Sequence, residues 1–292
     1  MSSRFPTLLL REWMQHKRGW LLTLILPPAI VLAILPFGHT DGVPNQALAA
    51  GLIIVLISVV AMLAITSISI GLQLPGLARR DVQDRSIEFW LSLPSSHSES
   101  LAATLLTHVL LVPLAAVVFG FFAGYVMTAG VVLKLAGPTG LAAIPWGAIT
   151  ALALPAVARI MAGVVLALVW LAPLVLLLMA ASAWLKRWSV AAVAAALVIT
   201  CTILPGVYGF VAVRDWLNHQ MHGAWNALLA DPQTIASSPE QIDQLDSTVA
   251  WHWVISDFTK ELQGLISLQM ASGLVIAAIG FYLLVLRRQR AG

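Results

Sequence analysis

Long apolar runs separated by short polar segments dominate the chain. Six of these runs are long enough to cross a bilayer, because an α-helical span needs about 20 mostly apolar residues. The pattern predicts spans at residues 20–37, 48–73, 101–133, 160–185, 189–213 and 264–286. The sequence therefore predicts one all-α, polytopic membrane domain with six transmembrane helices.

Residues 1–19, before the first span, have a different pattern. Phe5, Leu9 and Trp13 fall within one sector of a helix, and Arg18 lies opposite. This favours an amphipathic helix that lies in the membrane interface. A basic tail that only orients the first span is the alternative.

Two further segments interrupt the apolar pattern. Residues 135–158 carry no charge but contain Pro138, Pro145 and Pro155, which favours a surface hairpin or a re-entrant loop over another span. Residues 214–260 form a polar, acidic segment of 47 residues. At two places in it, a residue type that caps helix N-termini directly precedes a proline. We expect short helices in this second segment, on the extracytoplasmic side.

Composition supports the membrane assignment. The chain is 60% hydrophobic and 10% charged, whereas a soluble domain carries about 25% charged residues. The single cysteine, Cys201, excludes an intrachain disulfide.

The distribution of positive charge predicts the orientation. With the N-terminus inside, twelve Lys and Arg residues fall on the inner side of the membrane and four on the outer side. The inner residues are Arg4, Arg11, Lys17, Arg18, Arg79, Arg80, Arg85, Lys186, Arg187, Arg287, Arg288 and Arg290, and the outer residues are Lys134, Arg159, Arg214 and Lys260. Because cytoplasmic loops are enriched in Lys and Arg, both termini are expected in the cytosol.

The densely charged segment 77–100 separates the second and third spans and is predicted to be a cytosolic loop. On a helix its charges can pair along one side while Ile87 and Trp90 gather on another. A helix of this kind suits docking to another protein, because aromatic residues are enriched in interface cores. A helix that lies against the membrane is the alternative. Ser96 and Glu99 form a capping box that starts the next helix.

The run from Asp84 to Pro94, DRSIEFWLSLP, resembles the first cytosolic loop of bacterial type-2 ATP-binding-cassette (ABC) permeases. The layout is also similar: an amphipathic N-terminal helix, six spans and a larger outer loop before the sixth. The resemblance implies a homodimeric or heterodimeric exporter subunit in the bacterial cytoplasmic (inner) membrane. It also implies a separate ABC ATPase, present in two copies, that binds the ATP and magnesium. We expect the ATPase-coupling residues to be Asp84, Arg85, Ile87, Glu88, Phe89, Trp90, Lys186 and Arg187.

The absence of a phosphate-binding loop agrees with a separate ATPase subunit. No G-x-x-x-x-G-K-[ST] sequence occurs, so ATP hydrolysis is expected on a partner and not on this chain. Hydrolase motifs such as G-x-S-x-G and H-E-x-x-H are also missing. A membrane scaffold or assembly factor that acts through its outer loop remains an alternative, as does an ATP-independent secondary transporter or channel.

A polar stripe runs along the second span at helical spacing. Its members are Ser58, Met62, Thr66, Ser69 and Gln73. Polar groups are costly against lipid, so the stripe should face protein or a cavity. Two interpretations remain open: the stripe lines a translocation pathway, or its small residues ease helix packing.

Histidines provide the remaining candidates for chemistry. Asp215, His219 and His222 share one helical face and form a weak candidate metal site, for which a solvated polar face is the favoured interpretation. His108 lies within a predicted span, where a neutral histidine bonded to a neighbouring helix is favoured over a functional group. No bound cofactor is expected on this chain.

Overall fold

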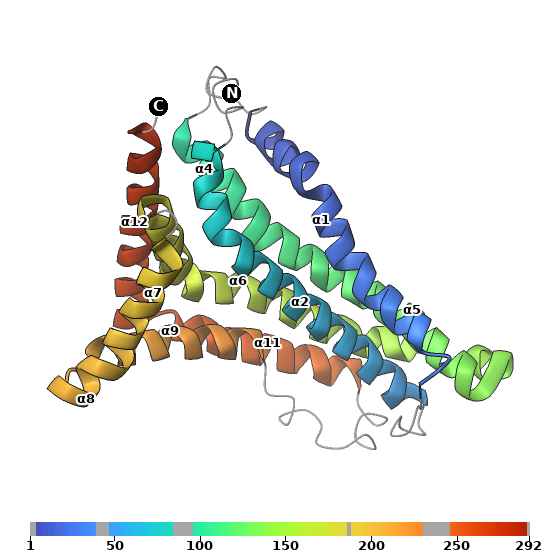
Figure 1. The fold of residues 1–292 in the computed structure, drawn as a ribbon. Helices are drawn as coiled ribbons and strands as arrows, with labels where there is room; N and C mark the ends of the chain where they lie inside the picture. Colours follow the sequence, from blue (N-terminus) through green and yellow to red (C-terminus); the bar gives the residue numbers. More distant parts are fainter. Residues whose placement is uncertain (1–3, 39–46, 84–95, 186–187, 230–245, 291–292) are drawn as a thin grey trace.

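The computed structural model describes residues 4–38, 47–83, 96–185, 188–229 and 246–290. These residues form helices and no strands (Figure 1). The helices are α1 (Arg4–Ile34), α2 (Ala47–Gln83), α4 (His97–Leu105), the π-helix η1 (Leu106–Leu111), α5 (Val112–Ala142), α6 (Trp146–Leu185), α7 (Ser189–Val198), the π-helix η3 (Ile199–Ile203), α8 (Leu204–Tyr208), α9 (Ala212–Leu228), α11 (Ser247–Gly264) and α12 (Leu268–Gln289).

Six helical segments of the described chain are long and apolar enough to cross a membrane, which confirms the predicted all-α membrane class. The segments are Phe5–Ile34, Ala47–Ala78, His97–Ala142, Trp146–Leu185, Ala191–Tyr208 and Leu268–Gln289. Both chain ends lie at the same end of the molecule (Figure 1), which is the arrangement that an even number of crossings requires.

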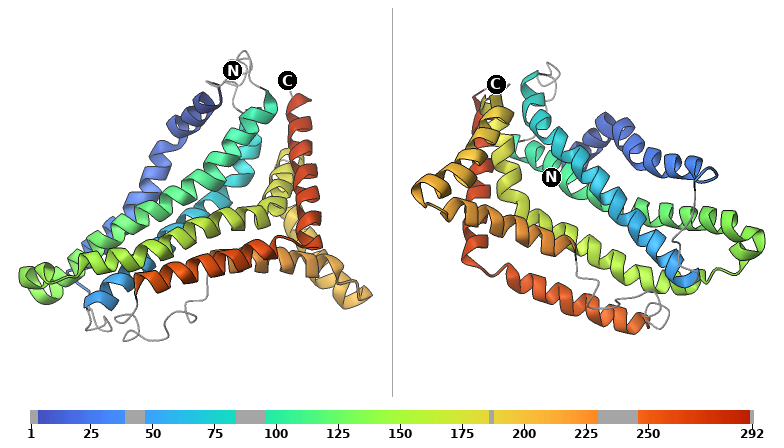
Figure 2. Two further views of the ribbon diagram at one scale, coloured as in Figure 1. Left: turned by 180° about the vertical axis from the view of Figure 1, so that it is seen from behind. Right: turned by 60° about the horizontal axis from the view of Figure 1, so that its bottom comes forward.

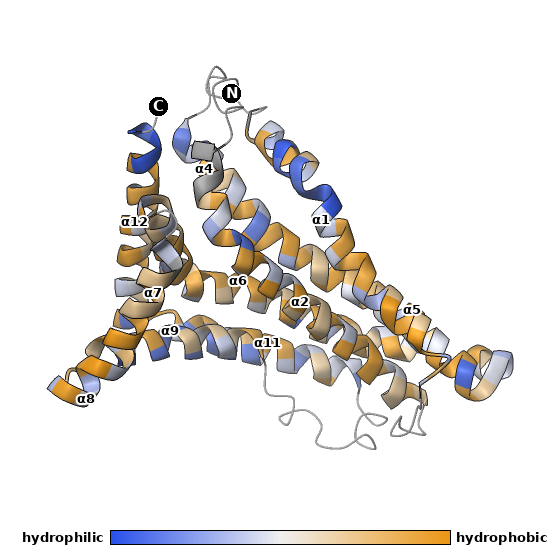
Figure 3. Ribbon diagram, viewed as in Figure 1, coloured by the Kyte–Doolittle hydropathy of each residue, from blue (hydrophilic) through white to orange (hydrophobic). Residues whose placement is uncertain are grey.

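Helix α6 is the centre of the packing. It contacts α2 and α5 on one side, α9 and α11 along another, and α12 toward its C-terminal end. The two further views in Figure 2 agree with this division, with α9 and α11 on the opposite side of α6 from α1 and α2. Figure 3 shows why α9 and α11 differ from the spans: hydrophilic residues recur along both of them, whereas α2, α5 and α6 are mostly hydrophobic.

Helices α2 and α5 approach each other very closely. A Cβ atom on Gly124 would lie 2.7 Å from the Val55 Cα atom, and one on Gly120 would lie 2.9 Å from the Val59 Cα atom. Such contacts exist only because these two positions have no side chain. Small residues at helical spacing are the usual means by which membrane helices approach this closely.

No helix end separates the first two predicted segments. Residues 4–34 form one continuous helix, so the expected interfacial helix at 1–19 and the expected span at 20–37 are two parts of α1. Nothing between them breaks a helix strongly, since a single glycine costs only about 1 kcal/mol relative to alanine. The charged first half is held by contacts with α4, as described below.

The segment 135–158 is the tip of a helical hairpin. Helix α5 continues to Ala142 through a kink at Gly137, whose φ of 66° suits glycine. Helix α6 then begins at Trp146 and passes through Pro155. The helix that contains the predicted fourth span therefore begins before residue 160, because prolines in apolar helices are tolerated more readily than the sequence pattern suggests.

Two long helices lie in the predicted outer loop 214–260. Helix α9 begins at Ala212, and α11 continues to Gly264. The preceding span ends at Tyr208, where Gly209 takes the left-handed conformation of a helix C-cap. The last span begins at Leu268, where the Ser267 side chain accepts a hydrogen bond from the Met270 amide.

Candidate functional site

The polar stripe of α2 divides into two parts. Ser58 and Met62 are buried against α5, where the Ser58 Cβ and Met62 Cβ atoms face the glycine positions Gly124 and Gly120. These two members of the stripe contribute to close helix packing. Whether the stripe as a whole lines a translocation pathway stays a prediction.

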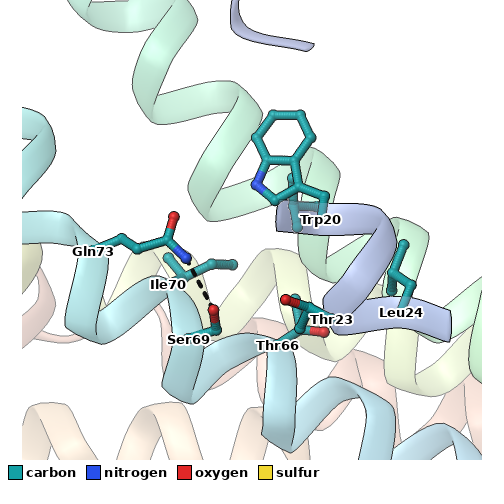
Figure 4. A pocket seen from close by; sticks show the side chains of 8 residues that line it. Trp20, Thr23, Leu24, Thr66, Ser69, Ile70 and Gln73 are labelled. Atoms are coloured by element: carbon teal, nitrogen blue, oxygen red, sulfur yellow. Dashed lines mark hydrogen bonds between the residues drawn. The ribbon is translucent and has the colours of Figure 1, made fainter. Parts of the chain in front are cut away.

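Thr66, Ser69 and Gln73, the other three members, line a pocket between α1, α2 and α5 (Figure 4). Helix α1 contributes Trp20, among others, to the same pocket. Gln73 Nε2 donates a hydrogen bond of 2.9 Å to Ser69 Oγ. The volume of about 10 Å³ is close to what one water molecule needs.

Two polar atoms beside this pocket are buried without a hydrogen-bond partner among the described residues. They are Trp20 Nε1, a donor, and Thr66 Oγ1, which can donate and accept. Buried polar groups normally have a partner, because leaving one unpaired costs about 1–3 kcal/mol. The pocket therefore suits a water molecule or a small polar group.

A second polar site joins α1 to α4 and η1, and sequence reasoning missed most of it. Glu12 and His108 are fully buried, although both lie in candidate spans. Glu12 Oε1 accepts hydrogen bonds from Arg11 Nη2 at 2.7 Å and from Thr104 Oγ1 at 3.1 Å. His16 Nδ1 and His108 Nδ1 lie 3.8 and 4.0 Å from Glu12 Oε2. We call Glu12, His16 and His108 the Glu–His cluster.

The spacing of these residues explains how the helices bring them together. Glu12 and His16 are one turn apart on α1, and Thr104 and His108 are separated by the same interval. The π-helix η1 contains His108, and π-helical turns inside α-helices are frequent at functional sites. The two i, i+4 pairs are the sequence signal that could have revealed the cluster.

Trp20 connects the Glu–His cluster to the pocket. Its ring is stacked on His16 with centroids 5.5 Å apart, and it meets the His108 ring edge-on at 5.2 Å. The same side chain lines the pocket with Thr66. The two polar sites therefore share one aromatic wall.

A buried ion pair holds α9 and α11 on α6. Arg159 Nε donates to Asp257 Oδ2 of α11 at 2.5 Å, and Arg159 Nη1 donates to the Ala227 carbonyl of α9 at 2.7 Å. The Arg159 residue is 1% exposed. Gly163 makes room for the Ala227 carbonyl, since a Cβ atom there would lie 2.2 Å from the oxygen. The assignment of Arg159 to the outer side of the membrane stays a prediction, and the structure adds that the side chain is buried between helices.

Glu261 lies near this ion pair on α11. Burial raises the pKa of its carboxyl, repulsion from Asp257 raises it further, and Arg159 acts in the opposite direction. The folded protein therefore holds the Glu261 proton more tightly than the unfolded chain does.

The predicted ATPase-coupling residues lie outside the described residues. This holds for Asp84, Arg85, Ile87, Glu88, Phe89, Trp90, Lys186 and Arg187. The capping box beside them is confirmed, because Ser96 Oγ accepts from the Glu99 amide at 3.2 Å and the Ser96 amide donates to Glu99 Oε2 at 3.0 Å.

The first turn of α4 gathers other helices. Arg288 Nη1 of α12 donates to the His97 carbonyl, and Arg11 Nη2 of α1 donates to Ser100 Oγ, both at 3.3 Å. The ends of α1, α4 and α12 therefore meet directly after the segment 84–95.

The weak metal candidate in α9 is not assembled. Asp215, His219 and His222 are exposed, and their ligand atoms do not form a group close enough to hold an ion. The His219 ring instead meets the Trp170 ring edge-on, with centroids 5.5 Å apart. Among the described residues, the Glu–His cluster is the group of three potential ligands that lie together.

The described residues thus offer a water-sized polar pocket, a buried cluster of titratable side chains beside it, and an ion pair that fixes α11 on α6. The first two suit the binding of small polar groups or ions within a helical membrane protein. In comparisons with known proteins, no family model, no curated protein and no solved structure matches this chain.

Proposed function

We propose that this chain is the membrane permease subunit of an ATP-driven ABC exporter. Two copies form the translocation pathway, and a separate ATPase docks on the cytosolic segment 77–100. The observation that carries the proposal is the motif from Asp84 to Pro94, which stands between the second and third spans. The missing phosphate-binding loop supports it, since the energy source must then lie on a partner.

The arrangement of the described helices supports a coupling role for this end of the molecule. The C-terminal end of α2 and the N-terminal end of α4 lie where both chain termini lie (Figure 1). Positive charge is concentrated in the segments assigned to this side, which favours a cytosolic position. An ATPase that docks here contacts the segment joining two long helices.

Helix packing supports the transmission of movement from that contact. Helix α2 is 37 residues long and runs from the coupling segment through the molecule. Gly120 and Gly124 let α5 pack directly on its backbone, so the two helices are expected to shift together. A displacement of the end of α2 is thereby passed to the pocket that Thr66 and Gln73 line.

A double substitution in the coupling segment tests the proposal. Arg85→Glu with Trp90→Ala reverses a charge and removes an aromatic anchor. The probe is a co-expressed ATPase that carries a phosphate-binding loop and is encoded beside this chain. We expect the ATPase to co-purify with the native chain and at least tenfold less with the variant.

Arg214→Glu with Trp225→Ala is a matched control. It makes the same two changes in α9, where the Arg214 side chain is 42% exposed and Trp225 is 63% exposed. This control should leave ATPase recovery unchanged. Equal recovery with the coupling variant and the native chain would contradict the proposal, as would the absence of any ATPase that binds the native chain.

A further inference from the structure

We propose that the Glu–His cluster is a binding site for a divalent transition-metal ion, with zinc as the best match. One carboxylate and two imidazoles are ligands that zinc commonly uses, and three protein ligands leave a fourth position for water or another small ligand. The site is formed by α1 and η1 and does not depend on the proposed transport function.

The three side chains lie at nearly the separation that a metal requires. One ligand atom of each residue lies within 4.8 Å of the other two. The Nδ1 atoms of His16 and His108 lie 3.8 and 4.0 Å from Glu12 Oε2. Tetrahedral zinc with bonds of about 2.1 Å places its ligand atoms about 3.4 Å apart. Small rotations of the side chains therefore suffice to assemble the site.

The carboxylate is oriented for this role. Arg11 and Thr104 both donate to Glu12 Oε1, while Oε2 is the oxygen that lies near the two imidazole rings. A carboxylate that is held through one oxygen presents the other in a fixed direction. Hydrogen bonds of this kind orient metal ligands and are a usual feature of metal sites.

The imidazoles are oriented by their own helices. His16 Nδ1 lies 3.1 Å from the Glu12 carbonyl oxygen, and His108 Nδ1 lies 3.0 Å from the Thr104 carbonyl oxygen. These contacts hold each ring beside Glu12, and a metal ion that binds Nδ1, the atom near Glu12 Oε2, replaces the proton that Nδ1 shares with the carbonyl. Trp20, which contacts both rings, limits access of water to them.

Arg11 allows a specific test, because its positive charge repels a metal cation at this site. Its guanidinium already neutralises Glu12 at 2.7 Å, so a divalent cation enters a site with no net negative charge. We therefore expect micromolar binding, weaker than in a structural zinc site. Removing this positive charge should tighten metal binding, whereas removing a ligand should weaken it.

The experiment uses the full chain without an affinity tag, purified in detergent micelles and treated with a chelator. Zinc is titrated by calorimetry, and cobalt is followed by its visible absorption, which is intense only in a tetrahedral site. We expect one zinc ion per chain and a tetrahedral cobalt spectrum that zinc abolishes.

Four substitutions separate a metal site from a merely structural cluster. Glu12→Gln and His108→Asn should each weaken zinc binding by at least about tenfold, and Arg11→Gln should tighten it by about tenfold. His222→Asn changes an exposed histidine of α9 and should have no effect. Elution as a single species in size-exclusion chromatography shows that each variant is folded.

If the variants of the two fully buried residues do not fold, His16→Asn decides, because this side chain is 22% exposed and its replacement disturbs packing least. It should weaken zinc binding by at least about tenfold. The proposal is refuted if the native chain binds no stoichiometric zinc, if zinc binding survives loss of a ligand, if Arg11→Gln weakens it, or if His222→Asn removes it.

Discussion

The close contact between α2 and α5 leads to a prediction with a clear sign. Gly124→Ala adds one Cβ atom, which would lie 2.7 Å from the Val55 Cα atom and 3.2 Å from the Val55 carbonyl oxygen. An ordinary contact to Cβ is 3.4–4 Å long, so the two backbones must separate by about 0.7 Å to restore one. We expect this variant to be less stable than the native chain.

Two opposing effects set the size of the change. Alanine is favoured over glycine within a helix by about 1 kcal/mol. Against this, a gap of 0.5–1 Å forfeits about a quarter to a half of the dispersion energy between facing atoms, and overpacking typically costs about 1–3 kcal/mol. Because the contacted atoms belong to the backbone, a side-chain rotation cannot relieve the clash. The net expectation is a loss of up to about 2 kcal/mol.

Gly71→Ala is the matched control. Gly71 lies on α2, and a Cβ atom there would have no neighbouring atom within 4 Å. The same chemical change should therefore leave stability unchanged or raise it by up to about 1 kcal/mol. Stability can be measured as the denaturant midpoint in mixed micelles, with tryptophan fluorescence as the signal. If both variants shift the midpoint equally, or Gly124→Ala shifts it upward, the close packing described here is wrong.

Two predictions concern the ion pair beneath α11. Asp257→Asn leaves the buried Arg159 guanidinium without its counter-charge and should lower the free energy of unfolding by about 3–5 kcal/mol. The loss is measured as faster hydrogen exchange in α11. As the control, Asp215→Asn removes the exposed pair with Arg214 and should lower the free energy of unfolding by only about 0–1 kcal/mol. The raised pKa of Glu261 contributes stability that is fully present below the ordinary glutamate pKa and is lost as pH rises through the folded-state pKa. Glu261→Gln should therefore be the more stable protein near neutral pH, and a thermal-unfolding series in which its advantage grew toward pH 4 would contradict this sign.

Most of the fold could be predicted from the sequence. Six spans and the all-α class follow from apolar runs, because the bilayer imposes a minimum length on each helix. Boundaries were less predictable. Residues 4–19 continue into the first span because no residue at the junction of the two segments terminates a helix. The prolines near residues 138–155 were interpreted as breaks, yet Gly137 and the turn before Trp146 confine the disruption to two short places.

The candidate site was less predictable, because it depends on contacts between distant residues. The α2 stripe was visible as a helical face, but its division between packing and pocket depends on where the α5 glycines lie. No sequence pattern singled out Glu12 as a buried residue. It is buried where α1 packs on α4 and η1, and it accepts a hydrogen bond from Thr104, 92 residues later. A pattern within one helix cannot show this partner.

The π-helix η1 lies between the contacts that join α1 to α4 and the contact that joins α2 to α5. Arg11 and Glu12 tie α1 to α4 through Ser100 and Thr104, just before η1 begins. Beyond η1, α5 is packed against the α2 backbone and is expected to resist independent movement. A π-helical turn contains an extra residue, and stretches of this kind are frequent at functional sites. We therefore expect any relative movement between the α1–α4 unit and the α2–α5 pair to be absorbed at η1. A metal ion bound by the Glu–His cluster would join α1 directly to η1 and oppose that movement.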